Sequence, residues 1–381
     1  CVNNNFKCIL FMTANSSNKG TDGGNIPTLY LDPDGVGTLD LSNCQGYIIS
    51  NLKEAVGSIS DLYFKGYFES ALPLIKLAYN IALKTDKSIQ QTEEYRKTLT
   101  TYYGLAGDVY GELGYRSDAL RLYENFQFLK MQLKSNLFKN QEPKDSVTLF
   151  QFRKFSEYTL ANLLKYEITL SRPSAMNDIV DTLVLSWINS PSFGRTSKFK
   201  KHLDVYKKSF QDFRIASFCE SNPSKEQIAV KNPLMWAHYA DEHRGFCVEY
   251  QFDKSDFRRD DFNNLTASRI FRVKYSDPGK KPIDFENSDS SLFIDVGFFT
   301  KSIEWSYENE VRLIQYKPTN GNIREQYSLS PKTKVIAIYF GFRCSPDIIQ
   351  IIKNLLCGRN IKFYQMDIDY SNVHRLKYKE I

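Results

Sequence analysis

The sequence predicts an α+β protein in which an N-terminal set of α-helical hairpins is followed by a larger domain of mixed helices and strands. Over residues 51–145, apolar side chains recur at three- and four-residue steps, which is the period of an amphipathic helix. Beyond this stretch, short runs of β-branched and aromatic residues alternate with helical runs. We therefore expect an irregular segment at 1–50, a helical repeat domain at 51–145 and an α+β domain with the functional site at 146–381.

The composition is that of a folded, soluble protein. Charged residues make up 25% of the 381 residues, and no apolar run reaches the roughly 20 residues that span a bilayer. The seven cysteines are scattered without a CxxC pair, which favours a reducing compartment and argues against a structural zinc site. We therefore expect a cytoplasmic protein with no membrane contact and no metal. The net charge of +6 permits nucleic acid as a partner without requiring it.

The first 50 residues are rich in Asn, Gly, Ser and Asp, a composition typical of irregular chain. Within them we expect one or two strands, at the apolar runs Ile9–Met12 and Tyr47–Ile49. Helical periodicity begins near Leu52. The chain starts with Cys1 rather than Met, which is typical of a fragment or a processed product.

Two stretches of the helical region resemble each other in the spacing of small and aromatic residues. The corresponding positions are Ala71, Ile75 and Ala78 in the first stretch and Ala119, Tyr123 and Phe126 in the second. This pattern is typical of tetratricopeptide-like helical hairpins, in which small residues let two helices approach closely. Because two hairpins are marginal alone, we expect a closing pair of helices at Ser146–Tyr166. We expect these repeats to bind a protein partner.

The α+β domain contains strands that are recognised by their β-branched and aromatic content. The candidate strands are Arg214–Cys219, Phe246–Phe252, Ile270–Tyr275, Glu310–Tyr316, Val335–Phe340 and Lys362–Met366. A further short strand is expected from Glu167. The last helix is predicted at Pro346–Cys357, with Ser345 as its N-cap and Gly358 at its end.

The stretch Leu234–Tyr250 holds half of the chain's four histidines. Trp236 and Tyr239 recur with His243 at helical spacing, so we expect one helix that Gly245 ends before a strand begins. This arrangement gathers four polar side chains near one helix end as candidates for binding a substrate. They are His238, Tyr239, His243 and Arg244. The alternative is that they are hydrogen-bonded packing and capping groups, as buried histidines and tyrosines commonly are.

A second stretch, Phe298–Ile314, carries two closely spaced carboxylates. Glu308 and Glu310 alternate on the approach to a predicted strand, so we expect their side chains on one face, within reach of one ligand. Two like charges this close raise one pKa unless a cation intervenes, and Arg312 and Lys301 are suitable cations. The alternative is an exposed strand edge that carries a ladder of charges.

Both stretches resemble an uncharacterised bacterial domain family. The likeness rests on the blocks Leu-Met-Trp-Ala-His-Tyr-Ala-Asp-x-His-x-Gly-Phe-Cys and Lys-x-x-x-Trp-x-Tyr-Glu-x-Glu-x-Arg-Leu-Ile. Asn177-Asp178, Ser217-Phe-Cys219 and a closing strand at Val335–Gly341 occur in the same order, so the resemblance covers residues 155–370. It implies a cytoplasmic domain, alone or fused, that sometimes occurs near toxin or phage-defence systems.

The run Glu308–Ile314 also resembles the Glu-x-Glu strand of arginine-type ADP-ribosyltransferases. The resemblance implies NAD as substrate, Glu310 as the catalytic residue that stabilises a developing positive centre, and Glu308 as the residue that orients the acceptor. It also implies that Arg244 holds the NAD phosphates and that an aromatic residue stacks on nicotinamide. The candidates for stacking are Trp236, Tyr239 and Trp305. The Ser-Thr-Ser strand of those enzymes has no counterpart at the expected distance before the glutamates.

The favoured hypothesis is a bacterial effector of defence or toxin type with an ADP-ribosyltransferase-like C-terminal domain, in which His238 also acts in catalysis. It predicts that six side chains converge in one cleft. They are His238, Tyr239, Lys301, Glu308, Glu310 and Arg312. One alternative is a nuclease in which Glu308, Glu310 and Asp178 hold a divalent metal. The other is a non-catalytic protein-interaction module, which predicts no polar cleft near Glu310.

Overall fold

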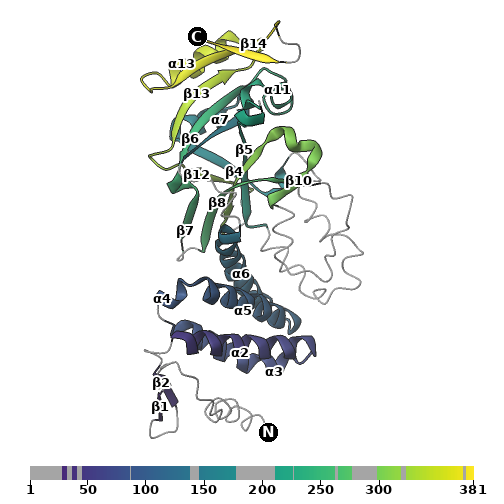
Figure 1. The fold of residues 1–381 in the computed structure, drawn as a ribbon, viewed down its shortest axis with the longest axis vertical. Helices are drawn as coiled ribbons and strands as arrows, with labels where there is room; N and C mark the ends of the chain where they lie inside the picture. The colour runs from purple at the N-terminus through teal and green to yellow at the C-terminus, as the bar shows by residue number, and fades with distance from the viewer. Residues whose placement is uncertain are drawn as a thin grey trace.

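The α+β fold is confirmed by a computed structural model, in which N-terminal helices precede a mixed sheet domain. Figure 1 shows the helices toward the N-terminal end of the molecule and the sheet toward the C-terminal end. The structure describes residues 28–31, 37–40, 45–85, 87–137, 146–176, 211–225, 227–261, 265–276, 298–318, 323–371 and 375–381.

Among the described residues, four long helices form two hairpins in the N-terminal region. They are α2 (Gln45–Phe64), α3 (Phe68–Leu83), α5 (Glu93–Glu112) and α6 (Arg116–Leu137), with the short α4 (Lys87–Gln90) between the hairpins. Each hairpin turns at a glycine with positive φ, Gly66 at 78° and Gly114 at 84°, a conformation that strains other residues. Thr92 caps α5 by accepting a hydrogen bond from the Tyr95 amide at 3.3 Å, so the second hairpin begins there.

The hairpins pack through the small and aromatic residues of the repeat pattern. All six corresponding positions are buried: Ala71, Ile75, Ala78, Ala119, Tyr123 and Phe126. At Gly107, α5 and α6 approach each other very closely, since a Cβ at this position would lie 2.8 Å from the Tyr123 ring. The ring cannot easily move aside, because the Tyr123 hydroxyl donates a hydrogen bond to Asp108 at 2.6 Å. The tetratricopeptide-like character of these hairpins stays a prediction.

Replacing Gly107 by alanine is expected to destabilise the helical region by about 1 to 3 kcal/mol, because the added methyl group overpacks the contact with Tyr123. The matched control is Gly57→Ala in α2, where a Cβ would meet nothing within 4 Å. There, alanine is expected to stabilise the helix by up to about 1 kcal/mol. Thermal unfolding followed by far-UV circular dichroism measures both variants. Shifts of Tm with the same sign and size would contradict the close packing at Gly107.

The described strands of the C-terminal domain form one large mixed sheet. Its order is β15-β14-β13-β6-β3-β5-β11-β8-β7, with β4 pairing with β5 and β12 pairing with β4. Its strands are β3 (Ser146–Arg153), β4 (Glu167–Ser171), β5 (Phe213–Glu220), β6 (Phe246–Asp253), β7 (Arg258–Asp261), β8 (Thr266–Arg272), β11 (Glu310–Tyr316), β12 (Arg324–Ser328), β13 (Lys334–Phe340), β14 (Lys362–Ile368) and β15 (Leu376–Glu380). Neighbouring strands are antiparallel, except that β13 and β14 are parallel.

The structure also contains shorter elements. Two strand pairs lie outside it, β1 (Thr28–Leu31) with β2 (Gly37–Asp40) and β9 (Lys274–Ser276) with β10 (Thr300–Ser302). The helices are α7 (Glu157–Lys165), α11 (Pro233–Tyr239) and α13 (Pro346–Leu355), with the 3-10 helices η4 (Lys254–Asp256) and η6 (Ile303–Glu308).

The two faces of the sheet bury different cores. One face packs against α7 and α13 around a core that includes Phe218 of β5. The opposite face is covered in two places, by α6 over β5, β8 and β11 and by α11 beside β3. Strand β5 passes under both covers, because Ile215 belongs to the core with α6 and Cys219 to the core with α11. Ser217 lies between them and is exposed, so the cover of this face is open at Ser217.

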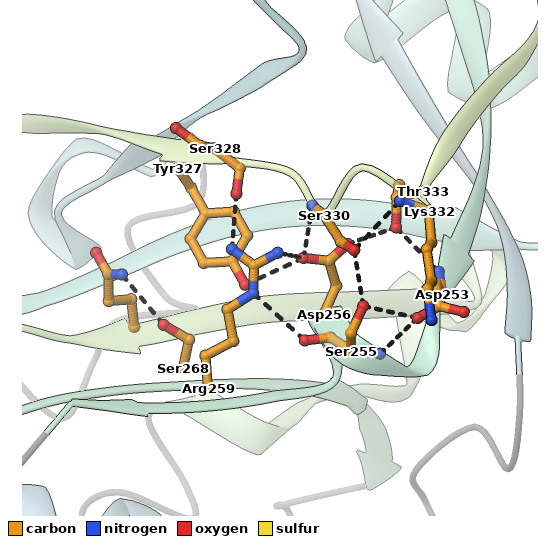
Figure 2. A network of polar contacts seen from close by, with 11 residues as sticks. Asp253, Ser255, Asp256, Arg259, Ser268, Tyr327, Ser328, Ser330, Lys332 and Thr333 are labelled. Atoms are coloured by element: carbon orange, nitrogen blue, oxygen red, sulfur yellow. Dashed lines mark hydrogen bonds and ion pairs between the residues drawn. The ribbon is translucent and has the colours of Figure 1, made fainter.

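A buried aspartate joins the turn between β12 and β13 to the chain that follows β6 (Figure 2). Asp256 is fully buried and accepts hydrogen bonds from the Ser330 amide, at 3.2 and 3.1 Å, and from the Thr333 hydroxyl. Arg259 forms an ion pair with the same carboxylate and lies 4.8 Å from the centroid of the Tyr327 ring. Burial raises the pKa of Asp256, although these partners oppose the shift. The network therefore fixes the end of β12 and the turn that follows it to η4.

The expected closing pair of helices at Ser146–Tyr166 is wrong, because this stretch forms β3 followed by α7. Strand β3 lies between β5 and β6, and consecutive residues such as Leu149 and Phe150 are buried on its two faces. A strand with two buried faces has a run of apolar residues, which periodicity alone does not separate from a buried helix.

The expected strand at Tyr47–Ile49 is also wrong, because these residues lie within α2. Ile48 and Leu52 are four residues apart and both are buried on the inner side of this helix. The other expected strand, Ile9–Met12, lies outside the described residues.

The strands predicted from Glu167 onward and the last predicted helix are present with small shifts of their ends. The six predicted strands correspond to β5, β6, β8 with β9, β11, β13 and β14, and the strand expected from Glu167 is β4. Ser345 caps α13 by accepting a hydrogen bond from the Asp347 amide at 3.3 Å, and Gly358 follows the helix with φ of 79°. In the described ranges, no helix is both long enough and apolar enough to cross a membrane.

Candidate functional site

Two segments far apart in the sequence dock onto each other where α11 meets η6. His238 Nδ1 lies 3.0 Å from the Tyr307 hydroxyl. The next residue of α11, Tyr239, donates a hydrogen bond from its hydroxyl to Glu308, the next residue of η6. Asn232, the N-cap of α11, donates from Nδ2 to the Tyr307 carbonyl at 3.1 Å. The stretches Leu234–Tyr250 and Phe298–Ile314 therefore form one structural unit.

Four charged side chains form a connected network at this unit. Lys301 Nζ lies 2.7 Å from Glu308 Oε2 and 3.5 Å from Glu310 Oε2. Arg312 holds both oxygens of Glu310, with Nε 2.8 Å from Oε1 and Nη2 2.9 Å from Oε2. None of the four residues is more than 7% exposed. Two cations and two carboxylates therefore compensate each other in the interior, as buried charges require.

The backbone explains why the two carboxylates converge. Glu308 ends η6, and Asn309 adopts a left-handed conformation with φ of 44° before β11 begins at Glu310. Glu308 therefore does not alternate with Glu310 along a strand as expected, and the turn through Asn309 brings both to Lys301 instead. Glu310 and Arg312 lie two residues apart in β11 and share one face, as the strand period predicts.

The network approaches the surface at Ser217. The Ser217 side chain is near enough to Glu310 to help lower the pKa of that carboxyl, and Ser217 lies opposite Arg312 in the pairing of β5 with β11. The Glu310 amide donates a hydrogen bond to the Tyr275 hydroxyl at 2.7 Å, which fixes the start of β11. Ser217 is therefore the exposed residue of this face that lies beside the buried Glu310 and Arg312.

The two glutamates have pKa values that are shifted in opposite directions. Burial, and then the charge of Glu310, raise the pKa of Glu308, although Lys301 and Tyr239 oppose the shift. Burial also disfavours the charged form of Glu310. However, Arg312 and then Lys301 outweigh burial and hold the pKa of Glu310 well below its usual range. Glu310 therefore stays ionised at neutral pH, and Glu308 is the carboxyl that binds a proton more readily.

An aromatic group lies next to the charged network. The ring centroids of Trp305 and Tyr307 are 6.0 Å apart, and the exposed His238 ring meets them edge-on at 6.5 and 6.2 Å. Lys301 Nζ lies 4.6 Å from the centroid of the Trp305 ring. One cation thus contacts the aromatic group and both carboxylates. The exposure of His238 distinguishes it from a buried packing histidine.

Three predicted binding residues do not take part in this network. Trp236 is fully buried in the core with α11, where its Nε1 donates a hydrogen bond to the Val230 carbonyl at 2.8 Å. His243 stacks on Trp236 with ring centroids 6.4 Å apart, and burial lowers the pKa of His243. Arg244 is exposed and forms an ion pair with Glu242 at 2.8 Å. Trp236 is thus a core residue, and Arg244 faces solvent.

The course of the backbone separates these residues from the network. Helix α11 ends at Tyr239, and residues 241–243 follow in left-handed conformations with φ between 50° and 71°. The expected continuous helix up to Gly245 is therefore wrong. Gly245 is needed for close packing, because a Cβ there would lie 2.2 Å from the Arg153 carbonyl oxygen.

Four residues of the site were not among the predicted ones. They are Asn232, Ser217, Tyr275 and Tyr307. Two of them had a local signal, since Tyr307 belongs to the second sequence block and Asn232 precedes Pro233 as a typical N-cap. Ser217 belongs to the Ser217-Phe-Cys219 motif of the resemblance, but its position beside Glu310, like that of Tyr275, depends on tertiary packing that a local pattern does not reveal. Among the described residues, no group of three or more His, Cys, Asp or Glu side chains can hold a metal, and Asp178 lies outside those residues.

Comparison with known proteins supports one part of the predicted resemblance. DUF2971, a family described as proteins of unknown function, matches residues 235–313. This segment contains η6 and most of α11, so the likeness to an uncharacterised domain family is confirmed for the segment in which α11 and η6 lie. The match is shorter than the predicted 155–370. No curated protein and no solved structure matches the chain.

Proposed function

We propose that the network of Lys301, Glu308, Glu310 and Arg312 is the catalytic centre of an NAD-handling enzyme whose chemistry is similar to that of an ADP-ribosyltransferase. The main support is the pair of neighbouring carboxyls with pKa values shifted in opposite directions. Such a pair suits one carboxyl to stabilising a charge and the other to transferring a proton. Their burial favours both roles, because charges interact more strongly where water is excluded.

In the proposed reaction, the bond between the ribose C1′ and the nicotinamide nitrogen breaks, and its electron pair leaves with neutral nicotinamide. The ribose then carries a positive, oxocarbenium-like centre, which the ionised Glu310 stabilises. A water molecule or an acceptor side chain attacks C1′, and Glu308 accepts the proton that this nucleophile loses. Water as the nucleophile gives hydrolysis of NAD, and a side chain gives ADP-ribosylation.

The residues around the two carboxyls support binding and orientation in this proposal. Trp305 and Tyr307 offer ring faces on which nicotinamide can stack, at the exposed edge where His238 lies. His238, the other residue proposed to act in catalysis, lies 3.0 Å from the Tyr307 hydroxyl and so helps to position that ring. Tyr239 donates a hydrogen bond to Glu308 Oε1 and so fixes the orientation of the Glu308 carboxyl group. Trp236 has no role in the proposal, because it is a core residue.

The setting of this activity is proposed from the resemblance: a bacterial effector of defence or toxin type that acts in the cytoplasm and whose helical hairpins dock a protein partner. The position of α6 supports a link between hairpins and site. Its residues Tyr123 and Phe126 share a core with Phe298. The Phe298 carbonyl in turn accepts a hydrogen bond from Arg312 Nη1 at 3.2 Å. One helix therefore connects the hairpins to the charged network.

Release of nicotinamide from NAD by the purified protein tests the proposal. We expect the wild-type protein to release nicotinamide faster than buffer alone and faster than the Glu310→Gln variant. Incubation of bacterial lysate with labelled NAD then distinguishes transfer to a protein, which leaves label on an acceptor, from hydrolysis. A folded wild-type protein that releases no nicotinamide, either alone or with lysate, would contradict the proposal.

A second candidate function is a non-catalytic interaction module, which one observation favours. Each charge of the network is paired, so the same contacts can serve to clamp α11 and η6 onto β10 and β11. If the network is only such a clamp, substitutions in it lower the stability of the protein, and neither the wild type nor the variants convert NAD. Measuring nicotinamide release and Tm on the same samples separates the two functions.

A further inference from the structure

A groove in the helical region lies away from the charged network. It runs between α3 of the first hairpin and the turn that joins α5 to α6 in the second, and its volume is about 720 Å³. This volume falls within the roughly 300 to 1,000 Å³ that is typical of ligand sites. Leu72 and Leu77 of α3 and Tyr110 of α5 supply apolar lining. The groove is therefore large enough, and apolar enough, to hold side chains of another molecule.

Two carboxylates give this groove an acidic character. Glu69 lies in the first turn of α3 and Asp118 in the first turn of α6, and both are exposed. Within the described part of the chain, neither forms an ion pair. Lys76 is the single cation among the lining residues, so two acidic groups face one basic group. The residues that line the groove thus have a net negative charge, whereas the whole chain has a net charge of +6.

Aromatic rings accompany the carboxylates. Tyr115, which is 52% exposed, lines the groove beside Tyr110, with ring centroids 5.9 Å apart. The charge of Asp118 contributes to raising the pKa of Tyr110, after burial, which places this carboxylate near the ring. Carboxylates together with exposed ring faces attract lysine and arginine through ion pairing and cation–π contact. A negatively charged partner such as nucleic acid would be repelled at the same place.

We propose that this groove binds a segment of a protein partner in which a lysine or arginine stands next to an apolar side chain. The cation contacts Glu69 and Asp118 beside the tyrosine rings, and the apolar side chain packs on Leu72 and Leu77. This inference specifies which kind of protein segment the helical hairpins bind. It rests on the proposed function, which assigns a protein partner to these hairpins. Its test is nevertheless independent of NAD.

Fluorescence anisotropy with labelled peptides tests this site on the whole protein. The probes are three peptides, each with two copies of a four-residue unit: Gly-Leu-Lys-Ser, Gly-Leu-Glu-Ser and Gly-Ser-Lys-Ser. We expect the first to bind about ten-fold more tightly than either of the others, which corresponds to about 1.4 kcal/mol. Because the carboxylates are exposed, this preference is expected to weaken as salt is added. Equal binding of all three peptides would overturn the proposal.

Matched variants locate the binding. Glu69→Gln with Asp118→Asn is expected to weaken binding of the Leu-Lys peptide about ten-fold. The control, Glu54→Gln with Asp61→Asn, changes the same charge on exposed positions of α2 outside the groove and is expected to leave binding unchanged. Equal weakening in both pairs would show general charge attraction and overturn the proposal. A dimer of the wild-type protein that the Glu69→Gln and Asp118→Asn pair dissociates would identify a second copy as the occupant instead.

The same variants separate this inference from the catalytic proposal. Glu69→Gln with Asp118→Asn is expected to release nicotinamide at the wild-type rate. Loss of peptide preference with intact nicotinamide release would overturn only the groove. Peptide binding by a protein that releases no nicotinamide would overturn only the catalytic proposal.

Discussion

Replacing Glu310 by glutamine is expected to lower kcat/KM for nicotinamide release by about 100- to 1,000-fold, because the substitution removes the anion that faces the developing positive charge. Glutamine has nearly the same size and can still accept a hydrogen bond from Arg312. The remaining loss therefore reports the missing charge. Initial rates of nicotinamide release at low NAD concentration, measured by liquid chromatography, give the value.

Loss of stability has to be separated from loss of catalysis, since removing one partner of a buried ion pair costs about 3 to 5 kcal/mol. The variant that carries both Glu310→Met and Arg312→Met removes both charges, a replacement that is often close to neutral for stability. We expect this variant to have a higher Tm than Glu310→Gln and to remain inactive. Glu304→Gln, at an exposed position of η6, is expected to keep full activity. Wild-type activity in the double methionine variant would contradict a catalytic role for Glu310.

Replacing Asp256 by alanine is expected to lower the free energy of unfolding of the sheet domain by about 3 to 5 kcal/mol. Asp256 is fully buried, and its carboxylate accepts hydrogen bonds from the Ser330 amide and the Thr333 hydroxyl (Figure 2). Alanine leaves these donors in the interior without that acceptor and removes the ion pair with Arg259. Differential scanning calorimetry of the variant and the wild type measures the effect.

Asp253→Ala is the matched control for this substitution. Asp253 caps η4 by accepting a hydrogen bond from the Ser255 amide at 2.9 Å, and its loss is expected to cost about 0.5 to 2 kcal/mol, as for other helix caps. Asp256→Asn, which keeps the shape but not the charge, is expected to lie between the two alanine variants. If both alanine variants lower the free energy of unfolding equally, Asp256 does not hold the turn after β12 in place.

Residue spacing and helix-capping residues predicted the features that depend on neighbouring residues in the sequence. The strand period placed Glu310 and Arg312 on one face, and the sequence Ser345-Pro346 predicted the start of α13. The same reasoning failed for a strand that is buried on both faces, because such a strand lacks the regular alternation of apolar and polar residues. Strand β3 is central and buried on two faces, so its apolar residues do not alternate strictly with polar ones, and their spacing is also compatible with the expected helix pair.

Part of the candidate site consists of residues that are neighbours in the sequence and also meet in space. Lys301 and Glu308 belong to one sequence block and form an ion pair at 2.7 Å. Trp236 shares a block with Tyr239 but points into the core, because α11 turns one side chain inward and the other toward Glu308. The buried Asp256 network had no local signal, since Asp256 contacts Ser330, which is 74 residues away in the chain.

The pH dependence of nicotinamide release by the wild type and by Glu308→Gln tests the central claim most directly. The pKa of Glu308 is raised above its usual 4.5, and the proposed reaction needs this carboxyl in its ionised form to accept a proton. Wild-type kcat/KM should therefore rise with pH through the raised pKa, on the basic side of 4.5. Glutamine cannot titrate, so the variant should be slower and should lack this rise. The same rise in both proteins would contradict the assignment of Glu308 as the proton acceptor.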